Sequence, residues 1–600
     1  MLTRYWHSKL EDEDFIITPE DAQLMRRKRR IIVIGSALLV LAILFGVFGT
    51  RPAGRTIRAW QARRHAQKAF AFINKEQWTD AHSEAMAAYQ LSPGQPEALR
   101  AVARYLTRLH SIEALDFWKE LSRKTSLTRL DVRDEAMIAI IAGDVALADT
   151  TVRELIGSHA EPADWLLAAQ LAMQKNLAEE AKSYLAKIVV DSRATESEQF
   201  RATLLQLALA ANSPSERTNA LARLEKSAEG KTATSLDALV VLAQNTLSAP
   251  ADSSDSTRNE AGRLASALEN HPLAKAKHNL LAFDLRLHAD PTQREQLIAR
   301  AIADWKDSDP ADRLDLARWL NSKGEYQRAI DSIPLEKAMQ SGDLFLQHLD
   351  ALGGLGRWNE IQQLLRSGRF PLEPFLETMY LARCNSQLGE QTASENNWQR
   401  ALEAAQGDAR KLITLAQYAE QNNDTEIAEA AYNNAAATSP RLRLAQDGRL
   451  RIAQASRDTK KIHAVLAAML ALWPDDLAIQ NDEAYTRLLR CPPAAPETRH
   501  QAAAIEKLAE KLIEREPHSL PHRTLLALAR LRQERAEDAL RVYSDLQVKQ
   551  DAVSGSALAV HAAILAATAN LENAKTEAAQ LKREQLLPEE QALVENLLDS

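Results

Sequence analysis

The sequence is poor in the residues that form disulfide frameworks and long irregular loops. Its 600 residues include two cysteines, 19 glycines and 21 prolines, and aromatic residues make up 5% of the chain. Two cysteines are too few for a disulfide framework, so we expect Cys384 to be a buried small residue and Cys491 a loop thiol. Alanine and leucine are abundant instead. Because both residues have high helix propensity, the composition favours a mostly helical chain with short turns.

The common motifs of catalytic and cofactor sites are also missing. The sequence contains no H-E-x-x-H, no glycine-rich phosphate loop, no G-x-S-x-G and no C-x-x-C pair. His518 and His522 have a spacing seen in metal sites, but they lack further ligands and have prolines beside them, which favours exposed histidines in a turn. We therefore expect no catalytic residue, no cofactor and no metal, and a chain that is not an enzyme.

One long apolar run lies near the N-terminus. Residues 31–49 carry no charge and, as a helix, would span about 28 Å, close to the hydrocarbon thickness of a bilayer. The run has no polar face, which disfavours a buried core helix. It is longer than the apolar part of a signal peptide and is not followed by a clear cleavage site. The sequence therefore predicts an uncleaved transmembrane helix over residues 31–50.

Basic residues flank this predicted span on both sides. Residues 26–30 are all Arg or Lys and adjoin the apolar run, whereas six basic residues are spread over 51–68. Since a contiguous cluster beside the span favours retention in the cytoplasm, we expect residues 1–30 to be a short cytoplasmic tail. The rest of the chain would then lie in the periplasm, behind a single-pass anchor in the inner membrane. The opposite orientation, with the repeats in the cytosol, is the alternative.

Charge separates residues 51–68 from the remainder of the chain. This basic juxtamembrane segment is compatible with contact to anionic lipid headgroups, with Trp60 at the interface, and equally with a solvated first turn of a helix. After residue 68 the chain holds 75 acidic against 61 basic side chains. An acidic array is repelled by phosphate backbones, so nucleic acid is not an expected partner.

A pattern of anchor residues repeats between residues 428 and 474. Small, large, small and proline positions recur after 34 residues. The first set is Ala428, Tyr432, Ala435 and Pro440, and the second is Ile462, Leu466, Met469 and Pro474. A fixed period of this length indicates helix–turn–helix repeats, none of which buries its apolar face alone. The order and spacing of these residues resemble the second helix of a tetratricopeptide repeat (TPR).

Further copies of the pattern support this resemblance. In residues 412–440, Leu415 and Ala416 form the large–small pair of the first helix, and Asn423 stands at the turn where the family often has glycine. Glycines at the corresponding turns of other copies are Gly324, Gly356 and Gly389. The resemblance implies an all-α fold, namely a right-handed superhelical solenoid of TPR-like helix–turn–helix repeats behind one N-terminal transmembrane helix.

The resemblance also divides the chain into segments. Beyond the tail (1–30) and the span (31–50), the expected segments are a basic juxtamembrane segment (51–68), degenerate TPR-like repeats (69–247), a polar loop (248–258), TPR repeats (259–587, clearest over 311–582) and a C-terminal capping helix (588–600).

In TPR arrays the first helix of each repeat faces the concave surface, and the position after the large–small pair points into it. The residues at this position are Arg318, Asp350, Arg383, Gln417 and Arg451. The resemblance therefore implies that these long polar side chains grip an acidic or C-terminal peptide. The alternative is that they are merely solvated helix residues.

These observations together predict a membrane-anchored scaffold for protein–protein interactions in a bacterial envelope complex. A protein or peptide would occupy the groove, and no small-molecule substrate is expected. Two other functions fit the sequence. One is an envelope enzyme with its active site in the degenerate region around 195–305, and the other is a TPR adaptor that faces the cytosol.

Overall fold

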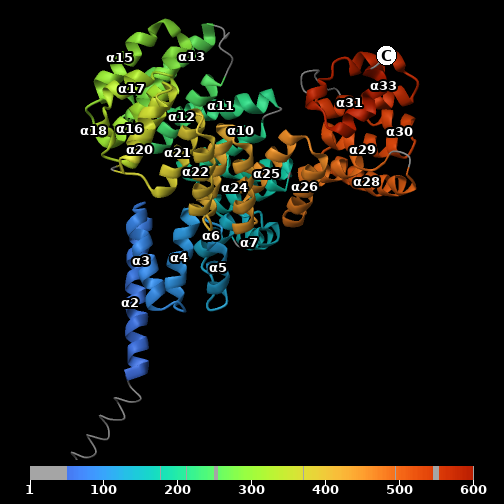
Figure 1. Ribbon diagram of the computed structural model, residues 1–600. Coiled ribbons are helices and arrows are strands. Elements are labelled where there is room, and N and C mark those ends of the chain that lie inside the picture. Colours follow the sequence, from blue (N-terminus) through green and yellow to red (C-terminus); the bar gives the residue numbers. More distant parts are fainter. Residues whose placement is uncertain are drawn as a thin grey trace, which may run out of the picture. The chain divides into compact units, whose positions relative to one another are not determined.

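A computed structural model describes residues 50–157, 159–175, 177–210, 213–248, 255–368, 370–492, 495–544 and 553–598 (Figure 1). Every regular element in these residues is a helix, which confirms the all-α prediction for this part of the chain. None of the helices described is long and apolar enough to cross a membrane. The predicted tail and residues 31–49 of the predicted span lie outside the described residues.

The chain divides into two compact units, one up to Ile138 and one from Ala139 onward. The first unit contains α2 (Thr50–Ile73), α3 (Trp78–Leu91), α4 (Pro96–Arg108), α5 (Ala114–Ser122) and most of α6 (Arg129–Ile141). Alanines form the contact between its first helices, because Ala66 and Ala69 of α2 and Ala85 and Ala88 of α3 are all buried in one cluster. Small side chains of this kind let two helices approach closely.

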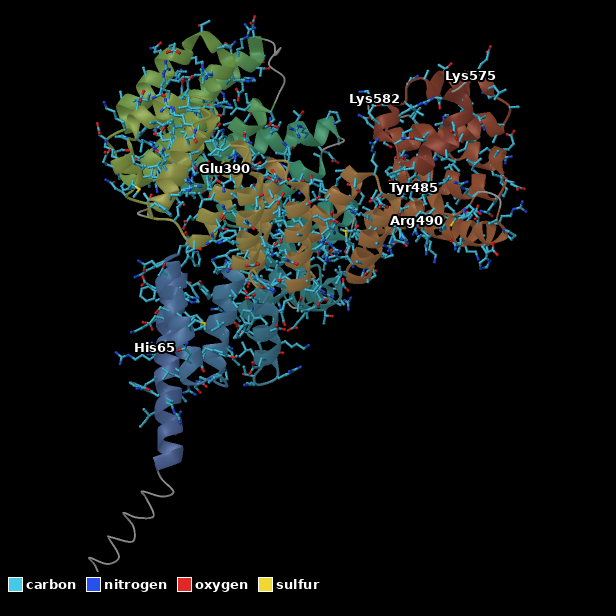
Figure 2. The ribbon with its side chains drawn as sticks, in the orientation of Figure 1. His65, Glu390, Tyr485, Arg490, Lys575 and Lys582 are labelled. Carbon is cyan, nitrogen blue, oxygen red and sulfur yellow. The ribbon has the colours of Figure 1, made fainter. Side chains whose placement is uncertain are left out.

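The basic segment 51–68 belongs to α2, which continues through it as one helix. Its Ile57 and Trp60 side chains are more than half exposed. At the other end of the segment, the His65 Nδ1 lies 2.6 Å from a carboxylate oxygen of Glu84 on α3 (Figure 2). Ile57, Arg58 and Trp60 of α2 are therefore exposed, while the second half of the helix packs as the first helix of a hairpin.

The second unit consists of a succession of helices. The first third contains α7 (Val145–Gly157), α8 (Pro162–Gln174), α9 (Ala178–Val190), α10 (Glu196–Leu209), α11 (Pro214–Ala228), α12 (Ala233–Leu247), α13 (Asp255–Asn270), α14 (Ala276–Ala289), η2 (Pro291–Gln293) and α15 (Arg294–Trp305). Residues 249–254 of the predicted polar loop lie outside the described residues, between α12 and α13.

The middle of this unit contains α16 (Pro310–Ser322), α17 (Tyr326–Ser332), α18 (Leu335–Ala338), α19 (Gly342–Gly354), α20 (Trp358–Arg366), α21 (Pro374–Gln387), α22 (Gln391–Ala404), α23 (Ala409–Gln421) and α24 (Thr425–Thr438). The last third contains α25 (Arg443–Ser456), α26 (Thr459–Leu472), α27 (Leu477–Leu489), α28 (Pro496–Arg515), α29 (Leu520–Arg532), α30 (Ala536–Arg541), α31 (Gly555–Ala567), α32 (Leu571–Ala578), η4 (Arg583–Gln585) and α33 (Pro588–Leu598).

Consecutive helices of this unit pack as hairpins, for example α21 on α22 (Figure 1). The helices α23 and α24 pair in the same way. A left-handed residue at the hairpin turn recurs along the chain with the repeat. At the turns inside five successive hairpins, from α16–α17 to α25–α26, the residues with positive φ are Gly324, Gly356, Gly389, Asn423 and Arg457, separated by 32, 33, 34 and 34 positions. Four of these five residues are Gly or Asn, which adopt this conformation most readily. The turn positions therefore recur with nearly the period that the anchor residues predicted.

The core is built from contacts between neighbouring hairpins. Tyr432 of α24 is fully buried, in one cluster with Ala416 and Ala419 of α23 and Ala445 of α25. Its hydroxyl group donates to Glu420 at 2.9 Å, so the polar end of the ring has a partner. The large ring thus fills the space between helices that carry small residues, as close packing requires.

Candidate protein-binding face

The five sequence-predicted residues occupy one equivalent position on successive first helices. Arg318 lies on α16, Asp350 on α19, Arg383 on α21, Gln417 on α23 and Arg451 on α25. The structure separates them into two kinds. Arg318, Gln417 and Arg451 are exposed, and Asp350 and Arg383 are half-buried. Asp350, Arg383 and Arg451 contact side chains of a neighbouring hairpin, and these contacts set them apart from Arg318 and Gln417.

Asp350 is half-buried and serves as an acceptor between two hairpins. The hydroxyl group of Tyr380 on α21 donates to its carboxylate at 2.9 Å. Burial raises the pKa of Asp350, and the hydrogen bond from Tyr380 opposes this increase only in part. Asp350 therefore stabilises the contact between α19 and α21. Its other oxygen accepts from the Gln347 side-chain amide at 3.5 Å, so both oxygens have donors within the chain.

Arg383 lies between two aromatic rings. Its guanidinium carbon is 5.1 Å from the ring centroid of Trp358 and 5.7 Å from that of Tyr418, in cation–π geometry. One terminal nitrogen is 3.4 Å from the Tyr418 hydroxyl group. Its Nε is buried without a hydrogen-bond partner in the part of the chain that the structure describes. Arg383 thus joins the hairpins on either side of α21 through stacking.

Arg451 is held by a carboxylate from the preceding hairpin. Its Nε and one terminal nitrogen donate to the two oxygens of Glu420, at 2.6 and 2.8 Å, and the same terminal nitrogen reaches the Tyr432 hydroxyl group at 2.9 Å. The hydrogen bonds from Arg451 lower the pKa of Glu420 despite its partial burial. A bidentate pair of this kind fixes the guanidinium, which leaves less of its donor capacity for a partner.

Sequence reasoning missed the partners of these three residues. Tyr380, Tyr418 and Glu420 supply the contacts, yet none of them belongs to the anchor pattern. The repeat length itself could have indicated these partners. Each of them lies about one repeat length along the sequence from the residue it contacts, on the adjacent first helix. We call this set of contacts (Asp350–Tyr380, Arg383–Tyr418 and Arg451–Glu420) the polar seam.

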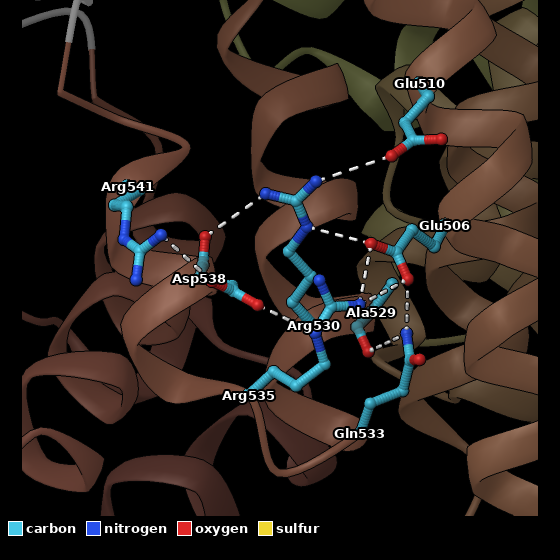
Figure 3. A network of polar contacts seen from close by, with 8 residues as sticks. All are labelled: Glu506, Glu510, Ala529, Arg530, Gln533, Arg535, Asp538 and Arg541. Carbon is cyan, nitrogen blue, oxygen red and sulfur yellow. Dashed lines mark hydrogen bonds and ion pairs between the residues drawn. The ribbon is translucent and has the colours of Figure 1, made fainter.

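A larger charge network joins α28, α29 and α30 (Figure 3). Glu506 is buried and accepts hydrogen bonds from Arg530, Gln533 and Arg535, at 2.8 to 3.0 Å. Burial would raise the pKa of Glu506, but the hydrogen bonds from Gln533 and Arg530 and the charge of Arg535 outweigh it, so the pKa is lowered. Glu506 is already saturated with donors, so this network has the character of a structural joint.

The described residues contain no group of three or more His, Cys, Asp or Glu side chains that could hold a metal ion. His522 of the predicted turn is buried, with its Nδ1 3.6 Å from Glu516, and His518 is exposed. The two histidines therefore have different environments, and the turn does not present both to solvent as the sequence led us to expect.

Comparisons with known proteins return alignments with solved structures and nothing more. No family model matches the sequence, and no curated protein matches it. Solved structures that align with it include the APC/C hetero-tetramer Cut9–Hcn1, at 11% identity over 88% of this chain and 95% of that chain, with a TM-score of 0.24. Yeast Tom70 aligns at 14% identity over 90% of this chain and 99% of its own, also with a TM-score of 0.24. At these scores neither structure informs on function.

Proposed function

We propose that this protein is a membrane-anchored scaffold of TPR-like repeats that binds a protein partner in a bacterial envelope complex. The observation that carries the proposal is the recurrence of one polar position on the first helices α16, α19, α21, α23 and α25. A row of equivalent positions on stacked hairpins forms an extended surface, which suits a peptide or protein ligand better than a small molecule.

The exposed members of this row that lie outside the polar seam indicate the chemistry of the partner. Arg318 and Gln417 are free to reach a ligand, and a guanidinium recognises a carboxylate through paired hydrogen bonds. The contacts of the polar seam join α19 to α21, α21 to α23 and α23 to α25, so they fix the position of the helix that carries Gln417. We propose that the partner contributes an acidic or C-terminal segment, with the seam as a rigid platform and Arg318 and Gln417 as contacts.

Membrane attachment rests on residues 31–49 and on the helix that follows. The apolar run is long enough to cross a bilayer. On α2, Arg58 is then exposed together with Ile57 and Trp60, a combination suited to the headgroup region. We propose a single span in the inner membrane, with the N-terminus in the cytoplasm because residues 26–30 form a contiguous basic cluster.

A binding comparison of three full-length proteins tests the scaffold function. Partners captured in cells by the tagged wild-type chain would be compared with those of Arg318→Ala/Gln417→Ala and of Arg400→Ala, a control on the exposed face of α22. We expect the double variant to lose at least about tenfold in affinity for one partner, because it loses charge-assisted hydrogen bonds, and the control to keep it. Equal capture by all three proteins would reject this face.

Reporter fusions test the orientation separately. A reporter that is active only in the periplasm, fused after residue 600, should be active. Neutral substitutions at Arg26, Arg27, Arg29 and Arg30 should reduce that activity. A cytoplasm-specific reporter that works at the same position in the unmutated chain would place the repeats in the cytosol and overturn the envelope role.

A further inference from the structure

The segment from Arg583 to Glu590 makes contacts that a linear stack of repeats does not require. In such an array each repeat contacts only its neighbours. This segment instead lies against α25, α26 and α27, and its partners precede it by 105 to 130 positions. Tyr485 of α27 and Lys582, directly before the segment, are both labelled in Figure 2.

An apolar side chain anchors the segment at its centre. Leu587 packs against the buried cluster that contains Ile462 and Leu466 of α26. It also packs against the neighbouring cluster of α27 to α31. By contrast, the adjacent Leu586 is buried in the separate cluster beneath α31 and α32. The two leucines therefore have different roles: Leu586 holds the segment to its own hairpin, and Leu587 inserts into the surface of earlier hairpins.

Polar contacts flank Leu587 on both sides. Arg457 donates to the carbonyl oxygen of Glu584 at 2.9 Å, and the Thr459 hydroxyl group donates to Glu589. Tyr485 donates to the carboxylate of Glu590 at 2.8 Å. Glu590 is buried, and its other oxygen accepts from the Leu587 backbone nitrogen at 2.8 Å, so both oxygens are satisfied. A main-chain contact, an apolar anchor and paired acids are the elements by which peptides are recognised in grooves.

The surface also has room beyond what the segment fills. A cavity of about 290 Å³ lies beside Leu587, and its lining includes Gln454, Asp482 and Ser556. Space next to an anchored side chain allows a different sequence of the same kind to occupy the site. We call the surface formed by Arg457, Thr459, Ile462, Leu466 and Tyr485 the α25–α27 groove.

We propose that the α25–α27 groove is a peptide-binding site that the chain's own segment Arg583–Glu590 occupies, and that a partner displaces it with a segment of the same chemistry. That chemistry is a leucine followed by acidic residues at the start of a helix, as in the chain's own Leu587, Glu589 and Glu590. The partner in this statement rests on the proposed scaffold function, whereas the occupancy of the groove by the chain's own segment does not.

Competition explains why the tethered segment would control access. Even a segment on a short flexible tether has an effective concentration of about millimolar, and the burial of Leu586 keeps this segment close to the groove. A free peptide must exceed this concentration or bind more tightly. The intact protein should therefore bind weak ligands poorly, and weakening the internal contact should open the groove.

The test measures binding of a fluorescein-labelled peptide with the sequence of residues 581–592 to full-length proteins by fluorescence anisotropy. The wild type should not bind it at tens of micromolar, because that is below the effective concentration of about millimolar for the tethered segment. Leu587→Arg should bind it saturably, because the variant places a charge on Ile462 and Leu466 and releases the segment. Adding Tyr485→Phe should weaken this binding at least about tenfold, since it deletes a hydrogen bond to a charged group.

Glu595→Arg is the matched control, since it changes charge on the exposed side of α33, the helix that begins directly after Leu587, and it should behave as wild type. Circular dichroism checks that each variant keeps its helical content. If Leu587→Arg loses helical content, Leu587→Ala replaces it as the released variant. No binding to a folded, released variant would overturn the proposal, as would equal binding to the wild type. A released variant that doubles its mass would show that a second copy is the occupant, which also contradicts a peptide partner. None of these outcomes depends on the partner captured through Arg318 and Gln417.

Discussion

The ring of Tyr432 lies directly on Gly448, so closely that a Cβ at residue 448 would overlap three ring carbons. Tyr432 is on α24 and Gly448 is on α25, so this contact joins two successive hairpins. A glycine in the middle of a helix costs about 0.5–1 kcal/mol relative to alanine. Here that cost is offset by the burial of a complete aromatic ring between repeats.

Removing the ring should reveal this coupling. Tyr432→Ala is expected to cost about 3–5 kcal/mol in unfolding free energy, as other large-to-small core substitutions do. Gly448→Ala should cost about 1–3 kcal/mol in the wild type through overpacking, and should become neutral or stabilising in the Tyr432→Ala background. Denaturant unfolding of the four proteins provides the double-mutant cycle.

Gly262→Ala is the control for that cycle. Gly262 lies in α13, and a Cβ there would have no neighbour within 4 Å. The Gly262→Ala substitution should therefore raise the free energy of unfolding by up to about 1 kcal/mol, through helix propensity and the lower entropy of the unfolded chain. If Gly448→Ala gave the same gain as Gly262→Ala, the close approach of Tyr432 would be refuted.

Arg104 connects two buried acids in the first unit. It donates to Asp131 at 2.8 Å and to Asp134 at 3.2 Å, and both carboxylates are almost completely buried. Arg104→Ala leaves these carboxylates short of a partner and should cost about 3–5 kcal/mol. Arg108→Ala removes a more exposed guanidinium, with 41% of its side chain accessible, and should cost clearly less. Comparable losses of unfolding free energy for the two variants would show that Arg104 stabilises the fold no more than Arg108 does.

Buried histidines should make the second unit sensitive to mild acid. Burial lowers the pKa of His278, His348 and His522, so the unfolded chain binds protons at a higher pH than the folded one. Their contribution is fully present above the unfolded pKa of about 6.5 and is lost as pH falls below it. The free energy of unfolding should therefore decrease between about pH 7.5 and 5.5.

The pKa values of Asp134 and Asp350 are raised, so protonation of these carboxyls stabilises the folded state as the pH falls and opposes the effect of the histidines. The variant His348→Gln separates the contribution of one histidine from that of the carboxyls. The variant should show a shallower dependence on pH than the wild type when denaturant unfolding is measured at both values. An unchanged slope would mean that His348 takes up its proton equally well in the folded state.

The two cysteines should differ in reactivity. Cys384 is completely buried, its thiol donates to the Trp358 carbonyl oxygen, and burial raises its pKa to about 11. Cys491 is only partly buried. Because the thiolate is the reactive species, a thiol reagent at pH 8 should label one cysteine in the native protein and both after unfolding. Cys491→Ala should abolish the native reaction, and rapid labelling of Cys384 would contradict its burial.

The repeat could be predicted from the sequence because it depends on local patterns. Tyr432 between small residues and the turn position of Asn423 follow from a period that one helical hairpin generates, and the structure has both. The division of the chain into segments is a prediction that the helices alone do not test.

The side-chain partners could not be predicted in the same way. The hydrogen bonds of Asp350 and Arg451 depend on which side chain of the adjacent hairpin comes within reach, and a residue pattern does not specify rotamers. The return of Leu587 to α26 has no period at all, because its partners lie more than 100 positions away. Such contacts arise from tertiary packing, which a repeat pattern does not encode.

We infer that the first helices of the hairpins form the face that binds a partner. A photo-crosslinking amino acid at Gln417 of α23 in the full-length chain in cells, with Arg400 of α22 as the control position, tests this inference. Position 417 should form one defined adduct with a partner protein, and position 400 should not. An adduct at 400 with none at 417 would place the partner on the opposite helices and refute the proposed face.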